Sequence, residues 1–153
     1  MKFLRSAIVV SLCMLAIVSC KKNDSTPAGQ AALIGKWQGQ KIHAIQSLNG
    51  QKVLDSMYQI KPPDYLYLDF HADSTLIISM HLSIFGGDST TDTTYYLVKQ
   101  GKLILTDSLQ DTNGYEQADY QISGNQLLLH EVQIDTIQNN VINSDITFYL
   151  QRM

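Results

Sequence analysis

Histidines and carboxylates are the side chains of this sequence that could bind a metal or move protons. The four histidines are His43, His71, His81 and His130, and no pair of them has the spacing of a zinc site. We expect histidines that are on the surface or hydrogen-bonded. The alternative reading turns His43 and His81 toward the domain interior, together with Asp69. The sequence predicts no metal site.

Catalytic motifs are also missing from the sequence. There is no Gly-x-Ser-x-Gly segment, and Ser79 near His81 does not sit in a glycine-flanked turn. No glycine-rich loop is suited to phosphate, and residues 88–92 lack the spacing of a calcium-binding loop. Nothing in the carboxylate spacing points to the paired acids of glycoside hydrolysis. We therefore predict that the protein is not an enzyme and uses no cofactor.

Cys20 is the residue whose context predicts covalent modification. Lys2 and Arg5 precede an apolar segment over residues 7–18, too short for the roughly 20 residues of a membrane-spanning helix. These are the parts of a secretory signal peptide. Residues 17–20, Ile-Val-Ser-Cys, resemble a bacterial lipobox. The resemblance implies cleavage after residue 19 and a multiply acylated Cys20, which would anchor the chain stably in a membrane. The alternative is ordinary secretion with a free thiol.

The composition of the chain that would remain after cleavage limits its domain number, its partners and its disulfides. Removing residues 1–19 leaves 134 of 153 residues, enough for one domain with a single core. Without Lys2 and Arg5, 9 basic residues face 14 acidic ones, a net charge near −5. This charge disfavours a nucleic-acid partner. Cys13 would be discarded, so no internal disulfide is expected.

Residues 20–32 read as the lipidated cysteine and a flexible tether, followed by a domain over residues 33–153. A single helical turn over residues 31–34 is the alternative to a tether that simply ends there. The apolar and polar residues of 65–70 alternate, as they do from 75 to 84, which predicts two strands. Residues 35–47 and 51–56 are expected to form a hairpin around Asn49-Gly50, a strong two-residue turn signal.

An internal repeat indicates how the strands are connected. Residues 96–105 match residues 120–129, and each copy reads as a strand, a glycine turn and a strand. A last strand is expected around residues 146–150. Hairpins in sequence, without a long crossover, predict an all-β, antiparallel up-and-down meander that closes into a barrel of about eight strands. A two-sheet β-sandwich is the alternative.

Several segments together resemble a lipocalin-like lipoprotein of the type found in Bacteroidetes envelopes. They are Gly35-Lys36-Trp37, the turn over 70–75, the two repeated hairpins and a last strand that ends at Arg152. The resemblance covers roughly residues 33–152. It implies a barrel floor at which Gly35 and Trp37 are structural and Arg152 stacks on Trp37, a cation–π contact.

The resemblance favours a barrel that binds a small apolar ligand. The residues expected to line it are Leu66, Leu68, Phe70, Leu76, Ile78, Met80 and His81. The alternative is a protein-interaction, inhibitor or structural module of the envelope, with a barrel filled by its own large side chains. The lipobox resemblance implies the cell envelope, and it suggests the outer membrane, because Lys21 stands where some bacterial lipoproteins carry the Asp that retains them in the inner membrane. The sequence does not indicate which membrane face or which oligomeric state.

Overall fold

The computed structural model describes residues 29–111, 113–114 and 116–153. The predicted signal peptide, Cys20 and most of the predicted tether lie outside these residues. The described elements are, in chain order, α2 (Gln30–Leu33), β1 (Gly35–Leu48), β2 (Gln51–Gln59), β3 (Tyr65–Phe70), β4 (Thr75–His81), a 3-10 turn η1 (Ser83–Phe85), β5 (Ser89–Lys99), β6 (Lys102–Thr106), β7 (Glu116–Ser123), β8 (Gln126–Ile137) and β9 (Asn140–Arg152).

The strands form one closed antiparallel barrel of eight strands with β2 as an extra strand. Each strand from β3 to β9 pairs with the next, and β9 pairs back onto β1. The N-terminal part of β1 pairs with β3, and its C-terminal part pairs with β2 on the same edge. The prediction of a closed up-and-down barrel is confirmed, and the sandwich alternative is wrong.

Local sequence explains most of these elements. Along β3, buried residues alternate with half-buried ones, as a strand with one face in a core requires. Asn49 and Gly50 both have positive φ, 51° and 82°, which gives the β1–β2 hairpin the turn that its twist favours. The two repeated segments are the β5–β6 and β7–β8 hairpins. The predicted helical turn forms as α2, one residue earlier than expected.

Several strand boundaries differ from the prediction, among them the end of β4 and the start of β5. Strand β4 ends at His81 instead of continuing to residue 84. The buried carboxylate of Asp64 accepts hydrogen bonds from the backbone N–H and the hydroxyl of Ser83, at 3.1 and 2.7 Å, which draws the chain into η1. The strand expected from residue 96 instead begins at Ser89, so residues 89–95 form the start of β5 and pair with β4.

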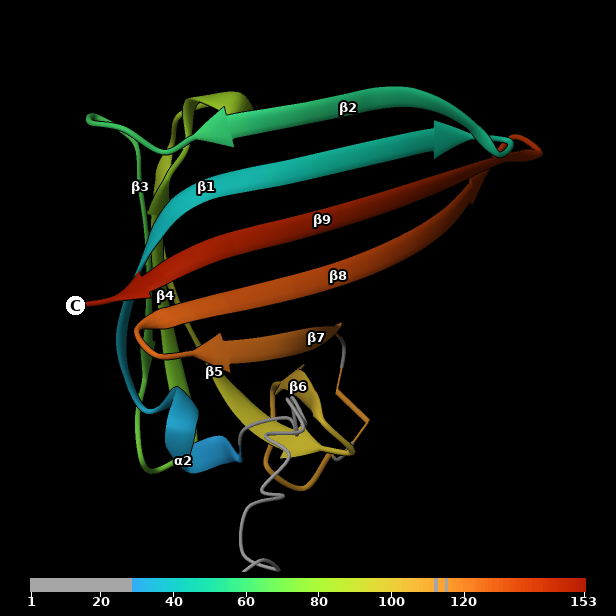
Figure 1. The fold of residues 1–153 in the computed structure, drawn as a ribbon. Coiled ribbons are helices and arrows are strands. Elements are labelled where there is room, and N and C mark those ends of the chain that lie inside the picture. The colour runs from blue at the N-terminus through green and yellow to red at the C-terminus, as the bar shows by residue number, and fades with distance from the viewer. Residues whose placement is uncertain (1–28, 112, 115) are drawn as a thin grey trace, which may run out of the picture.

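Four strands run well past the barrel wall, as Figure 1 shows on the right. We call this sheet the extension; it comprises residues 41–48 of β1, all of β2, residues 131–137 of β8 and residues 140–146 of β9. Its two hairpin tips are joined, because the Asn49 N–H donates to the Val141 carbonyl at 2.8 Å and the Asn49 side chain donates to Asn140 at 2.9 Å. The extension is therefore one sheet rather than two separate hairpins.

The barrel floor is built around Trp37 and α2. Trp37 and Leu33 are fully buried. The Arg152 guanidinium lies 4.2 Å from the Trp37 ring centroid, so the expected cation–π contact is present. Arg152 also donates to the carbonyls of Ala32 and Ile34, each at 2.7 Å, and the Trp37 indole donates to that of Leu33 at 2.8 Å. These bonds satisfy carbonyls that the short helix leaves unpaired.

Candidate ligand cavity

A cavity of about 250 Å³ lies inside the barrel. Its walls come from β3, β4, β6, β7, β8 and β9, strands that bring alternate side chains to the interior. Most of its lining is aliphatic or aromatic. The lining residues are Leu66, Leu68, Leu76, Ile78, Met80, Leu103, Leu105, Glu116, Ala118, Leu129, Glu131 and Phe148.

Five of the seven residues predicted to line a ligand lie on this cavity, namely Leu66, Leu68, Leu76, Ile78 and Met80. Phe70 does not. It is buried nearer the floor, where its ring meets Tyr96 edge to face at 5.0 Å. That these five residues contact a ligand remains a prediction, because the geometry shows only that they surround a space.

His81 does not line the cavity either. It lies on the outer face of β4, since Leu76, Ile78 and Met80 take the inward positions of that strand. Its ring stacks on Tyr65 at 5.9 Å, and its Nε2 is 3.8 Å from Asp64. Side chains of a strand point alternately to its two faces, so the alternation that turns Met80 inward turns the next residue, His81, outward.

Two glutamates form the polar part of the cavity lining. The pairing of β7 with β8 stops at Asp119 and His130, and just beyond this point Glu116 and Glu131 both face inward. Burial, followed by the hydrogen-bonding and charge repulsion of the neighbouring Glu116 carboxyl, raises the pKa of Glu131 to about 7. The Glu131 carboxyl group is therefore partly protonated near neutral pH.

Sequence reasoning missed this pair, although the signal was present. Glu131 continues the inward alternation of Leu127 and Leu129, and Glu116 continues that of Ala118. What a single strand could not reveal is the register between β7 and β8, which brings the two side chains together. The chain contains only these two glutamates.

Tyr120 adds an unsatisfied polar group to the barrel interior. It lies two residues along β7 from Ala118 and pairs directly with Leu129, and both of those residues line the cavity. Tyr120 is 7% exposed, and its hydroxyl has no hydrogen-bond partner among the described residues. Burial raises its pKa, so the phenol stays protonated and can donate.

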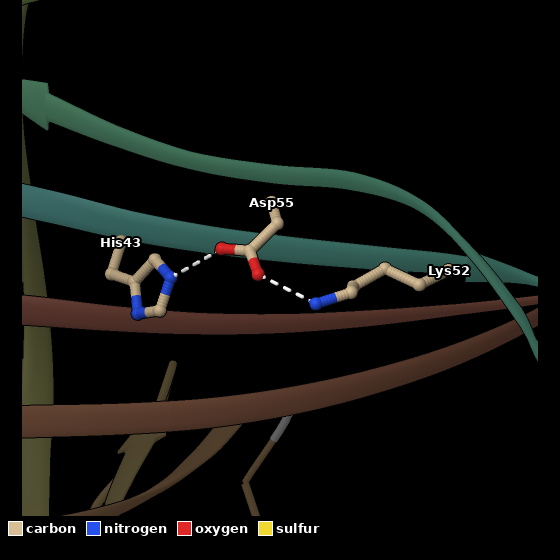
Figure 2. Close-up of polar contacts among 3 residues, drawn as sticks. All are labelled: His43, Lys52 and Asp55. Atoms are coloured by element: carbon tan, nitrogen blue, oxygen red, sulfur yellow. Dashed lines mark hydrogen bonds and ion pairs between the residues drawn. The ribbon is translucent and has the colours of Figure 1, made fainter.

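The other polar clusters lie on outer surfaces. Figure 2 shows Asp55 between His43 and Lys52, at 2.9 and 2.7 Å, on the outer face of the extension. The hydrogen bond from Lys52, followed by that from His43, lowers the pKa of Asp55. All three side chains are substantially exposed, so this group is suited to holding β1 against β2 rather than to chemistry.

The remaining histidines have the same character. His130 contacts Asp145 at 3.0 Å across β8 and β9, and His71 lies 3.7 Å from Asp69. The alternative reading, with His43 and His81 inside the barrel beside Asp69, is wrong, because all three take outward register positions. Among the residues that the structure covers, no group of His, Cys, Asp and Glu could hold a metal ion.

No protein-family model matches the chain, and no curated protein is significantly similar. Within residues 29–153, apart from the two undescribed positions, no helix is long and apolar enough to cross a membrane.

Proposed function

We propose that this chain is a lipid-anchored lipoprotein of the cell envelope whose lipocalin-like barrel binds one small apolar ligand. The observation that supports ligand binding is the interior cavity of about 250 Å³ with its mainly aliphatic lining. Ligand sites in proteins are typically concave and apolar with a few convergent polar groups. This cavity has that composition, with Glu116 and Glu131 as the polar groups.

The size of the cavity limits the ligand. A well-packed core leaves few spaces larger than a water molecule, whereas a dry apolar cavity of about 150 Å³ already accepts benzene. The space here is larger than that, although it is below the usual range for drug-sized molecules. A single ring system or a short alkyl chain fits this volume. The cavity also counts against the alternative of a barrel filled by its own side chains.

Native mass spectrometry of the full chain, purified gently from its own cells, tests ligand binding. We expect a copurifying small molecule that is lost on denaturation. Ala118→Trp should exclude it, because Ala118 is a small residue on the cavity wall. Gln117→Trp is the matched control, since the neighbouring side chain is exposed on the outer face. An apo mass for the wild type, with no stabilisation by a panel of lipids and hydrophobes, would remove the proposal.

The membrane anchor is supported by the lipobox-like segment that ends at Cys20. A diacylated or triacylated cysteine holds a protein on a bilayer without a spanning helix. Cys20→Ser should release the chain from the membrane fraction and remove the mass of the acyl groups. Outer-membrane location follows from the same resemblance and is tested by fractionating the two membranes. Unchanged membrane association of Cys20→Ser would contradict the anchor.

An interaction module remains the second candidate, and one observation favours it. The extension exposes apolar side chains on both faces, including Leu54, Val132 and Ile134, the last of which is 65% exposed. Exposed apolar groups gathered on one element are typical of contact surfaces. If the mass measurement finds no ligand, partner capture with the wild type and a Val132→Thr/Ile134→Thr variant becomes the test of this second function.

A further inference from the structure

The charges around the cavity identify the class of ligand. Both charged side chains in the lining are carboxylates, Glu116 and Glu131. Among the described strands, Arg152 is the only basic residue at an inward register position, and it lies at the floor, held by Trp37 and α2. The other acidic or basic residues at inward register positions, Asp92 on β5 and Asp135 on β8, are both acidic. Apart from Arg152, whose guanidinium is already engaged at the floor, the described inward positions therefore offer no cation to a bound anion.

Among the described residues, neither Glu116 nor Glu131 forms an ion pair with a basic side chain. The ion pairs of the described residues join other acids, such as Asp55 and Asp119, to basic groups on the outer surface. Glu116 and Glu131 instead both line the cavity, and the raised pKa of Glu131 means that its carboxyl group keeps a proton up to about neutral pH. Two like charges in a partly buried site raise the free energy of the fully ionised pair. A cation from outside the protein would replace that proton and relieve the repulsion.

We propose that the cavity binds an amphiphilic amine, with its small apolar body among the leucines and its ammonium group between Glu116 and Glu131. This inference rests on the proposed function, because it assigns a ligand class to the same cavity. The apolar lining would contact the body of such a ligand, and the two carboxyl groups would bind its ammonium group. A fatty acid of the same length would place its carboxylate against two acids and is disfavoured.

Tyr120 is a separate observation that points to a ligand with polar atoms. Its unpartnered hydroxyl, buried beside the cavity walls, is a donor that the described residues leave unused. A buried donor without an acceptor is unfavourable in the empty protein. An oxygen or nitrogen acceptor on the body of the amine, reaching the deeper part of the cavity, would satisfy it. The natural ligand is therefore expected to be a functionalised amine rather than a plain hydrocarbon chain.

The test compares three probes with the same tail: octylamine, octanol and octanoate. The full chain is held in nanodiscs, and isothermal titration calorimetry is run at pH 7 with empty nanodiscs subtracted. We expect octylamine to bind about tenfold or more tightly than octanol, and octanoate to bind most weakly, because a charge-assisted hydrogen bond is stronger than a neutral one. Titrations in buffers of different ionisation enthalpy should also show proton release on octylamine binding.

Variants assign the preference to the pair. Glu116→Gln/Glu131→Gln should abolish the advantage of octylamine over octanol, and Glu131→Gln alone should reduce it. Asp119→Asn/Asp145→Asn is the matched control, because it removes two carboxylates from the outer face and should keep the preference. Thermal unfolding of each variant verifies folding, and the single variant serves if the double variant does not fold.

The outcomes separate this inference from the proposed function. If octanol binds as tightly as octylamine, or if the preference survives the double glutamine variant, the amine assignment is wrong while the cavity still binds ligands. If none of the three probes binds, or if Ala118→Trp leaves binding unchanged, ligand binding in the cavity is itself wrong. Loss of the preference in the outer-face control would also overturn the assignment, because long-range charge would then explain it.

Discussion

At the scale of single residues, Glu131 has a carboxyl group whose protonation changes on folding. In the unfolded chain it has an ordinary pKa of 4.5, whereas burial and Glu116 raise the pKa to about 7 in the barrel. The folded state therefore holds a proton that the unfolded state loses between these values. The free energy of unfolding should fall as pH rises from about 4.5 to about 7 and level off above. Urea unfolding across this range measures it.

Glu131→Gln should remove this part of the pH dependence, because the amide does not titrate. Asp55 and Asp73 have lowered pKa values, so their contributions are lost only below their ordinary value of 3.8, outside the window. Asp119→Asn is the control, since its carboxylate lies on the outer face beside Lys102. Equal pH profiles for wild type and Glu131→Gln would mean that Glu131 in the folded protein does not keep its proton up to about pH 7.

Arg152 carries the second prediction at this scale. Its guanidinium makes two hydrogen bonds to carbonyls next to α2 and covers the Trp37 ring. Arg152→Ala should lower the free energy of unfolding by about 2 kcal/mol, through lost charge-assisted bonds and cation–π contact. Arg152→Lys keeps the charge without the planar fork and should lose about half as much. A change below about 0.5 kcal/mol for Arg152→Ala would mean that the floor does not depend on this contact.

At the scale of the elements, Gly39 shows how strand β1 passes over the barrel core. The pairing of β1 with β9 shifts register between Gly39 and Lys41. A Cβ at position 39 would lie 2.8 Å from Cδ1 of Ile60 and 2.9 Å from Cβ of Leu66. Gly39→Ala should therefore cost about 1–3 kcal/mol in chemical unfolding, as overpacking does. Because Leu66 lines the cavity, ligand affinity should fall as well.

Gly29→Ala is the matched control for this substitution. A Cβ at Gly29 meets nothing within 4 Å, and the residue has an ordinary extended backbone before α2. Its stability should change by no more than about 0.5 kcal/mol. If the two alanine variants were equally stable, the close packing of β1 against Ile60 and Leu66 would be wrong.

Elements were predictable from sequence wherever one strand face is buried. Strand β3 and the Asn49-Gly50 turn could be predicted from their own residues, because side-chain periodicity and a preference for positive φ are local properties. The end of β4 was missed, since Leu82 and Ile84 continue its alternation while the cause of the break, Asp64, is distant in sequence. The Glu116–Glu131 pair was missed for a related reason: neither strand alone specifies the register that joins them.

At the scale of the whole molecule, closure of the barrel was predictable and the extension was not. Sequential hairpins specify a meander, and a meander with one apolar face closes readily. The extension arises because β1, β8 and β9 are 14, 12 and 13 residues long while β3 and β6 are 6 and 5. The alternation within a long strand does not show which of its residues lie outside the barrel. That depends on where the neighbouring strands end, and those strands are elsewhere in the sequence.

The extension leads to the last prediction, which concerns stability across the molecule. Strand β2 pairs with β1 alone among the described strands, and all but one of its residues are exposed. Residues 131–137 of β8 likewise pair only with β9. Amides there should exchange with solvent through local opening, whereas those of β1 and β9 near Trp37 and Leu150 should exchange only on global unfolding.

Hydrogen–deuterium exchange followed by mass spectrometry of peptides measures this difference. We expect peptides from residues 51–57 to exchange at least about tenfold faster than peptides around residues 36–39. The comparison should be repeated at several protein concentrations. Protection of β2 that rises with concentration would indicate that a second copy covers its free edge, as exposed strands permit. Equal protection of β2 and the floor at every concentration would contradict an extension that is less stable than the barrel.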